Sequence, residues 1–130
     1  MPGKIFIDTN VVVYSLGQAS TKVHLAAPLF VGLPTISTQV LSETANVASK
    51  RLGLTVSEIR KLITSLEAMC RVEIISLVTI HKALDIRERY SFSWYDSLIV
   101  ATALESGCDT LYSEDSNQTS TLTGTAPAPP

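Results

Sequence analysis

The sequence predicts one α/β domain in which a short parallel sheet lies between two layers of helices. Short segments rich in apolar and β-branched residues alternate with longer segments whose apolar residues follow a helical period, which is typical of such a sheet. The chain has 130 residues, of which 45% are hydrophobic, so it can form one hydrophobic core. It contains no internal repeat, and its apolar runs fall far short of the roughly 18 residues that indicate a membrane span.

The first half of the chain contains two predicted strands and three predicted helices. The first strand stops abruptly at Asp8, where a helix begins. Gly17 and Gly53 end the first and third helices, because glycine readily adopts the backbone conformation that terminates a helix. Pro28 interrupts the pattern of the second helix. In chain order these elements are the strand Ile5–Ile7, the helices 11–16 and 22–31, the strand 34–38 and the helix 39–52.

The second half contains three predicted helices and two predicted strands. Thr55 and Glu58 have the spacing of a capping box, which opens the first of these helices, and Gly107 ends the last. In the middle helix, Ala83 and Leu84 are expected to face the core. In chain order these elements are the helix from Thr55 to about Cys70, the strand 72–75, the helices 79–89 and 94–106, and the strand Thr110–Ser113.

The composition changes from Ser116 onward. The chain becomes polar and then Pro-rich, and Leu122 is its single large apolar residue there. Such a segment cannot bury enough apolar surface to offset the entropy lost on ordering. We therefore expect a folded domain over residues 1–115 and a flexible C-terminal tail over residues 116–130.

Charge and cysteine content limit the possible functions. The formal net charge is −2, which neither indicates nor excludes nucleic-acid binding, because carboxylates around a metal ion count as negative while being neutralised in place. Cys70 and Cys108 are far apart and form no Cys-x-x-Cys motif, which argues against a zinc site and a disulfide framework. The N-terminus enters the first strand directly and leaves no room for a signal peptide. These features predict a cytoplasmic protein.

Two acidic residues stand at positions that suggest a site. Asp8 follows the first strand and would lie at the carboxyl edge of the sheet, where open α/β sheets bind ligands; it could equally be an N-cap. Asp96 stands three residues after Ser93, the spacing of a capping box. However, the helix that follows is apolar all round, which is typical of a buried helix. A carboxylate at its buried end would need a cation, strong hydrogen bonds or a raised pKa.

Two further acids complete a set of four. Glu43 lies early in the helix 39–52, at the margin of its apolar stripe, where a solvated first-turn glutamate would also be expected. Asp115 follows the last strand and would share the carboxyl edge of the sheet. Carboxylate clusters without His or Cys suit hard cations such as Mg²⁺ or Mn²⁺, which can activate a bound water and stabilise charge on a phosphate. The residues therefore suggest metal-assisted phosphoryl chemistry.

Four stretches that carry these acids resemble the PIN-domain ribonucleases and, more closely, the VapC-like toxins of type II toxin–antitoxin systems. The resemblance extends from the first strand to Asp115. A lone Asp-Thr-Asn would be a weak signal, but four motifs in this order at this chain length are specific. They are Phe6-Ile7-Asp8-Thr9-Asn10, Gln39-Val40-Leu41-Ser42-Glu43, Ser91-Phe92-Ser93-Trp94-Tyr95-Asp96-Ser97-Leu98-Ile99 and Cys108-Asp109-Thr110-Leu111-Tyr112-Ser113-Glu114-Asp115.

The resemblance implies a fold, an activity and partners. The implied fold is a three-layer α/β/α sandwich around a short parallel sheet. The implied reaction is hydrolysis of an RNA phosphodiester by a metal-bound water, with RNA as substrate. The family's partners are a small antitoxin that covers the active site and usually a second copy of the chain. By the same resemblance, Mg²⁺ or Mn²⁺ would be held by Asp8, Glu43, Asp96 and Asp115, with Asn10 and Ser113 supporting the site through hydrogen bonds.

The C-terminal end departs from the family pattern. Such proteins usually continue after the last acid with a Gly-containing turn and a final apolar strand, whereas this chain continues with Ser116-Asn117-Gln118-Thr119-Ser120. We therefore expect the final edge strand of the sheet to be missing. A second hypothesis follows from this, namely a catalytically impaired PIN-domain relic with an altered C-terminus that still binds an antitoxin.

Other classes of phosphate-handling domain are excluded by single positions. A receiver domain needs paired acids after the first strand, and here Ile7 precedes Asp8. An Asp-x-Asp phosphatase fails because Asn10 replaces the second Asp.

Substrate contacts are harder to identify. Lys4, Lys50, Arg51, Arg87 and Arg89 could hold phosphates, but each is more often an ordinary solvated charge. The aromatic residues Trp94 and Tyr95 could stack on a base, but we expect both to pack in the core.

Overall fold

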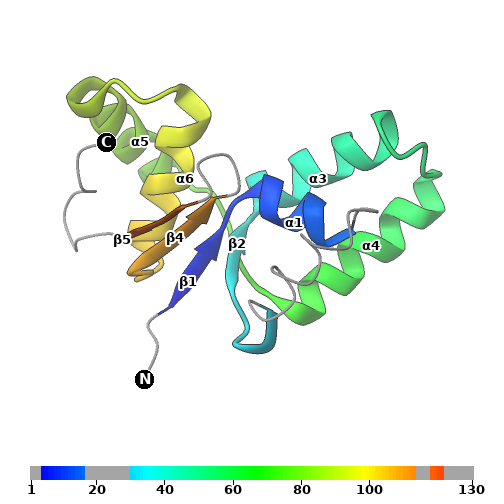
Figure 1. Cartoon of the computed structure of the whole chain (residues 1–130). Coiled ribbons are helices and arrows are strands. Elements are labelled where there is room, and N and C mark those ends of the chain that lie inside the picture. The colour runs from blue at the N-terminus through cyan, green and yellow to red at the C-terminus, as the bar shows by residue number, and fades with distance from the viewer. Residues whose placement is uncertain (1–3, 17–29, 114–117, 122–130) are drawn as a thin grey trace.

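The structure, a computed structural model, describes residues 4–16, 30–113 and 118–121. Its centre is a five-stranded sheet (Figure 1). The first four strands in the spatial order are parallel, and the fifth is antiparallel to its neighbour. Across the sheet the order is β3 (Arg71–Glu73), β2 (Thr35–Ser37), β1 (Ile5–Ile7), β4 (Thr110–Ser113) and β5 (Gln118–Thr121).

Helices cover both faces of this sheet, which confirms the predicted three-layer α/β/α architecture. The connections from β1 to β2 and from β2 to β3 run in one direction, whereas the connection from β3 to β4 crosses back over β1. Because such crossovers are right-handed, reversing their direction places the last pair of helices on the opposite face. The helices are α1 (Thr9–Leu16), α3 (Thr38–Lys50), α4 (Val56–Met69), α5 (Leu77–Tyr90) and α6 (Trp94–Glu105).

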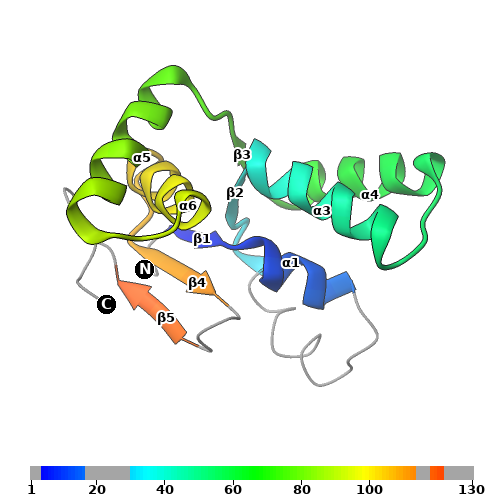
Figure 2. The same cartoon turned by 90° about the horizontal axis from the view of Figure 1, so that it is seen from above.

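Two pairs of helices give the molecule its shape. Helices α5 and α6 pack against each other beside β4, whereas α3 and α4 form a hairpin that projects from the β2 side of the sheet (Figure 2). Helix α1 starts at the end of β1 and packs against α3. The end of β1 therefore lies between the projecting α3–α4 pair and the compact α5–α6 pair.

Much of the core lies between the sheet and α6, and Val12 of α1, Val40 of α3 and Leu66 of α4 also belong to it. Phe6 and Ile7 of β1 and Ile36 of β2 are fully buried. On α6, all eight residues from Ser97 to Leu104 are buried, as its continuous apolar sequence predicts. The only polar side chains in that run are Ser97 and Thr102, whose hydroxyls donate to the carbonyls of Ser93 and Leu98 at 2.8 Å each. Helix α6 is thus buried without an unsatisfied hydroxyl.

Most predicted elements are present, with shifted bounds. The capping box at the start of α4 is formed, since Thr55 and Glu58 exchange their hydrogen bonds. Helix α5 begins at Leu77, two residues earlier than predicted, because Ser76 acts as its N-cap. The prediction that Leu84 faces the core is wrong: this side chain lies on the outer face of α5, about half exposed.

The prediction that the final edge strand is missing is also wrong. Residues Gln118–Thr121 form β5, which pairs with β4 from Ser113↔Gln118 to Thr110↔Thr121. An edge strand is held by main-chain hydrogen bonds, so a polar Gln-Thr-Ser-Thr sequence can supply it without apolar side chains. The tail predicted from residue 116 therefore contains a strand of the sheet. The rest of that tail, over 122–130, lies outside the described residues.

The helix predicted over 22–31 lies almost entirely outside the described residues. Among the helices that the structure describes, none combines the length and apolar character needed to cross a lipid bilayer.

Candidate active site

The site begins where β1 meets α1. Strand β1 has β2 on one side and β4 on the other, so its carboxyl end is the point where the strand order reverses, the usual ligand position in open α/β sheets. Asp8 occupies the cap position of α1, because its carbonyl accepts from the backbone N–H of Val12 at 3.3 Å. Its Oδ1 accepts from the backbone N–H of Thr9 at 2.6 Å. Asp8 is therefore both a helix cap and a half-buried carboxylate at the sheet edge.

Glu43 is brought to the same place by α3. Ser37 caps this helix by accepting from the N–H of Val40 at 3.2 Å, and Glu43 follows in its second turn. The Thr9 hydroxyl donates to Glu43 Oε1 at 2.6 Å, the short distance typical of a hydroxyl bonded to a carboxylate. Gln39 Nε2 approaches the same oxygen at 3.5 Å. Glu43 is thus held through one carboxylate oxygen.

Two buried polar atoms beside this contact have no partner among the described residues. They are Gln39 Oε1 and Thr44 Oγ1. Gln39 is only 8% exposed, and an unsatisfied buried amide oxygen costs free energy. Both atoms belong to α3. This helix therefore places buried polar groups close to Glu43, in addition to the Glu43 carboxylate itself.

Asp96 comes from the first turn of α6. Ser93 caps α6 by accepting from the Asp96 N–H at 3.1 Å. In the described structure the Asp96 carboxylate makes no reciprocal bond to Ser93, so this is half of a capping box. The side chain is exposed, so the requirements of a carboxylate at a buried helix end do not apply to Asp96. The buried part of α6 begins one residue later, at Ser97.

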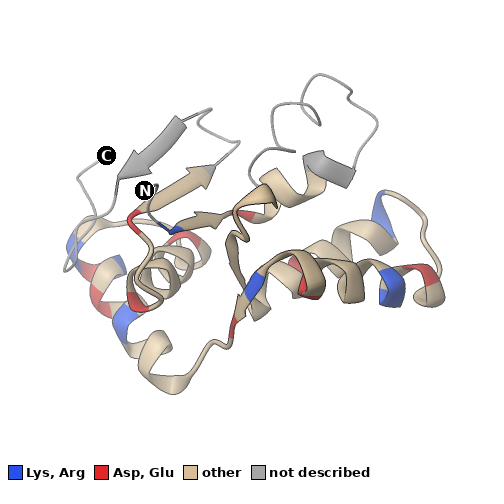
Figure 3. Ribbon diagram, turned by 90° about the horizontal axis from the view of Figure 1, so that it is seen from below, with Lys and Arg blue, Asp and Glu red and all other residues tan. Residues whose placement is uncertain are grey.

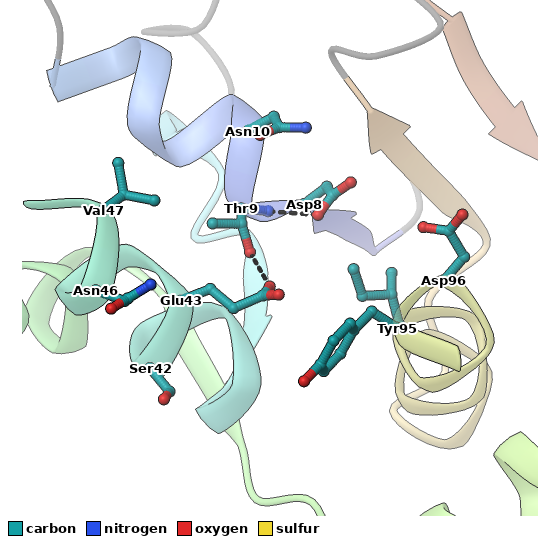
Figure 4. A pocket seen from close by; sticks show the side chains of 10 residues that line it. Asp8, Thr9, Asn10, Ser42, Glu43, Asn46, Val47, Tyr95 and Asp96 are labelled. Carbon is teal, nitrogen blue, oxygen red and sulfur yellow. Dashed lines mark hydrogen bonds between the residues drawn. The ribbon is translucent and has the colours of Figure 1, made fainter. Parts of the chain in front are cut away.

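These three acids face one cavity of about 630 Å³. Figure 4 shows Asp8 between Glu43 on one side and Asp96 on the other. Among the described residues that line the cavity there is no lysine or arginine. The lining consists of Asp8, Thr9, Asn10, Ser42, Glu43, Asn46, Val47, Tyr95, Asp96 and Ile99.

The donor atoms of this cavity suit a hard divalent cation. They are carboxylate, hydroxyl and amide oxygens, without His or Cys, the set that Mg²⁺ and Mn²⁺ prefer. Within the described residues, however, no three His, Cys, Asp or Glu side chains lie close enough together to form a ready metal site. The chemistry of the donors therefore fits such an ion, whereas the three acids line the cavity without converging on one point.

Of the three remaining predicted site residues, Asn10 and Ser113 lie in the described part of the chain and Asp115 does not. Asn10 lines the cavity from the first turn of α1. Ser113 is the last residue of β4, next to the strand that carries Asp8. Asp115 lies outside the described residues, so its place in the site stays a prediction.

The helices around the cavity add a favourable field for anions. Asp8 immediately precedes α1, and Asp96 lies in the first turn of α6. Because helix N-termini carry partial positive charge, both ends favour negative groups in the cavity. The field supports the carboxylates and would equally favour a phosphate.

The basic residues considered from the sequence do not line the cavity. Lys4 Nζ donates to the Ser106 carbonyl at 2.7 Å, and Arg87 Nη1 donates to the Phe92 carbonyl at 2.6 Å, so both brace backbone turns. Lys50 and Arg51 lie exposed at the far end of α3. Figure 3 shows lysine and arginine on the helices and also at the sheet, where Arg71 lies in β3.

The two aromatic residues at the start of α6 differ. Trp94 packs against the core, as expected. Tyr95 does not: it is 59% exposed and lines the cavity. The sequence did not single out Ser42 and Asn46 as site residues, although Asn46 lies three residues after Glu43 and four after Ser42, spacings at which side chains are neighbours on a helix.

The family model described as PIN domain matches residues 5–121, which includes β5. A comparison with curated protein sequences found no match.

Three solved structures share the fold. The VapC20 toxin of Mycobacterium tuberculosis, described as cleaving the sarcin–ricin loop, has a TM-score of 0.71 at 19% identity, covering 88% of this chain and 92% of that one. A toxin–antitoxin complex from Klebsiella pneumoniae has a TM-score of 0.61 at 22% identity, covering 83% of each chain. FitAB bound to an IR36 DNA fragment gives 0.59 at 18% identity, covering 78% and 79%. With residues 5–121 matched, this chain belongs to the PIN-domain family.

Proposed function

We propose that this protein is a metal-dependent endoribonuclease and the toxin of a toxin–antitoxin pair. The observation that carries the proposal is the cavity at the β1–α1 junction, which three carboxylates line and no lysine or arginine does. Such a cavity suits a divalent cation better than direct binding of a phosphate. Membership of the PIN-domain family and the fold shared with the VapC20 toxin support ribonuclease chemistry.

Asp8, Glu43 and Asp96 would hold Mg²⁺ or Mn²⁺, with Asp115 as a fourth acid. When bound, such an ion supplies a water of lowered pKa and stabilises charge on the phosphate. Thr9 donates to Glu43 Oε1 and would thereby orient the Glu43 carboxylate for the ion. The N-termini of α1 and α6 favour the phosphate through their partial positive charge. Asn10 and Ser113 would support the site through hydrogen bonds.

Partners follow from the same proposal. RNA is the substrate, so we expect the activity in the cytoplasm. A cognate antitoxin would cover the cavity, as one neighbouring structure is a toxin–antitoxin complex.

A second copy of the chain is proposed at another surface. Ile74, in the segment before α5, is 78% exposed, and Leu77 and Val78, in the first turn of α5, are 80% and 67% exposed. Three such apolar side chains within five positions indicate an interface. Light scattering should therefore give the mass of a dimer for the wild type and of a monomer for Leu77→Glu. A monomeric wild type would refute this part of the proposal.

The relic hypothesis has lost its main support. It depended on a missing final strand, and β5 is present and paired along β4. A relic would still differ from an enzyme in one measurable respect, since it would bind the antitoxin without binding a metal at the carboxylates.

Calorimetric titration of Mn²⁺ into chelator-treated protein tests the metal site. Binding is expected in the wild type and should be lost in Asp8→Ala. Asp85→Ala is the matched control, because Asp85 is an exposed acid on α5 that does not line the cavity. Absence of binding in the wild type would favour the relic.

Cleavage of total RNA tests the activity. With Mg²⁺, Asp96→Asn should cleave at least about 100-fold more slowly, the order of effect of losing one group that stabilises transition-state charge. Because Asp96 is exposed, the variant should fold as stably as the wild type. An unchanged rate would refute the assignment of Asp96.

A further inference from the structure

Besides its three acids, the cavity is lined by an exposed aromatic side chain, that of Tyr95. Tyr95 precedes Asp96, so their Cα atoms are about 3.8 Å apart, yet the Tyr95 ring is 59% exposed. Nothing in the described structure stacks on this ring, since the one aromatic pair found joins Tyr90 and Phe92. Figure 4 shows the ring extending from α6 toward the α3 side of the cavity. An exposed aromatic ring therefore forms part of the wall next to the acids.

The opposite wall is uncharged apart from Glu43, and it combines polar side chains with the apolar Val47. Ser42 and Asn46 of α3 line it, and both are exposed. Figure 4 shows their side chains on the α3 side, across the cavity from Tyr95. Hydroxyl and amide groups can donate to and accept from the edge of a base. A flat apolar face on one side and neutral hydrogen-bonding groups on the other match the two surfaces of a nucleobase.

We infer that Tyr95 is the stacking residue for a base of single-stranded RNA, next to the phosphate at the carboxylates. The inference depends on the proposed ribonuclease function and adds a residue that contacts a base of the substrate. A base can reach the Tyr95 face only when it is unstacked from its neighbours, as in loops and single strands. Stacking on Tyr95 is a contact that an RNA base can make in this cavity and a free phosphate cannot.

The test measures binding of two fluorescein-labelled oligoribonucleotides of equal length, one of mixed sequence and one whose central nucleotides are abasic. Both carry the same charge, so they differ only in their bases. The measurements use the Asp96→Asn background, in which cleavage is suppressed. Tyr95→Leu should weaken binding of the mixed-sequence RNA about 5- to 150-fold, the effect of losing one stacked base. Tyr95→Phe, which keeps the ring, should bind like the parent.

The abasic RNA separates stacking from a general role of the residue. Its affinity should be the same for Tyr95→Leu and the parent. Equal weakening of both RNAs, or no weakening of either, would overturn the inference. Cleavage by the otherwise wild-type protein is a separate readout: base-dependent binding without any cleavage would keep the role of Tyr95 and refute the proposed activity.

Discussion

The hydrogen bond between Thr9 and Glu43 can be tested as an isolated interaction. It joins residues 34 positions apart at 2.6 Å, and Thr9 is only 7% exposed. Valine has the shape of threonine, so Thr9→Val removes the hydroxyl and little else. Hydrogen bonds to a charged group contribute about 1.5–3 kcal/mol. Because Glu43 is half-buried, water can replace part of the bond, and we expect the lower end of that range.

A double-mutant cycle isolates this contribution from other effects of the substitutions. Urea unfolding of the metal-free wild type, Thr9→Val, Glu43→Ala and the double variant should give a coupling energy of about 1.5 kcal/mol. Thr9→Val alone should lower the melting temperature by roughly 5 °C. Thr64→Val is the matched control, since the Thr64 hydroxyl on α4 only bonds the carbonyl of Arg60. Additive effects, within about 0.3 kcal/mol, would refute an energetically significant bond.

The same variant has a functional consequence. A residue that hydrogen-bonds to a metal ligand without itself binding the metal typically contributes 10- to 100-fold to metal affinity. Mn²⁺ should therefore bind roughly tenfold more weakly to Thr9→Val, and Thr9→Ser, which keeps the hydroxyl, should restore the affinity. If Thr9→Ser also bound Mn²⁺ more weakly than the wild type, the effect would come from packing and not from the hydrogen bond.

Three further outcomes are expected. A chain ending before Gln118 should lose about 2–4 kcal/mol of stability in urea relative to one ending after Thr121, because the β4–β5 ladder is lost; an equal stability would show that β5 contributes nothing. The backbone N–H and side chain of Thr55 lower the pKa of Glu58 below 4.5, so the stability advantage over Glu58→Ala should be complete above that pH and shrink as the pH falls through the lowered value. Burial raises the pKa of Cys70 to about 11, so native protein should react slowly with iodoacetamide at Cys70 at pH 8. Rising pH above about 9 should also destabilise the fold, since only the unfolded thiol ionises there.

Local patterns predicted much of the fold. The buried strand Ile5–Ile7 and the capping box at Thr55 depend on residues close in sequence, and the structure has both. Helix α5 began earlier than predicted because the N3 partner of Ser76 is Thr79 and not the usual Glu or Gln. Strand β5 was missed because main-chain pairing with β4 holds it, which side-chain composition does not report.

The site was predictable as a set of acids but not as a cavity. Asp8, Glu43 and Asp96 line one space, whereas the position of Asp115 stays a prediction. The bond from Thr9 to Glu43 depends on how α1 packs on α3. The exposure of Tyr95 depends on how the first turn of α6 is oriented relative to the core, since its neighbour Trp94 packs against the core. Neither fact follows from spacing along the chain.

The burial pattern of α6 determines how its variants can be interpreted. Asp96 is exposed, whereas every residue from Ser97 to Leu104 is buried. Side-chain changes across those eight positions would create cavities, strain or unpaired polar groups. In a saturation screen for cell survival, loss of toxicity at these positions would mostly report lower protein abundance. At Tyr95 and Asp96 it would report the site itself, so the two kinds of phenotype meet at two consecutive residues, Asp96 and Ser97.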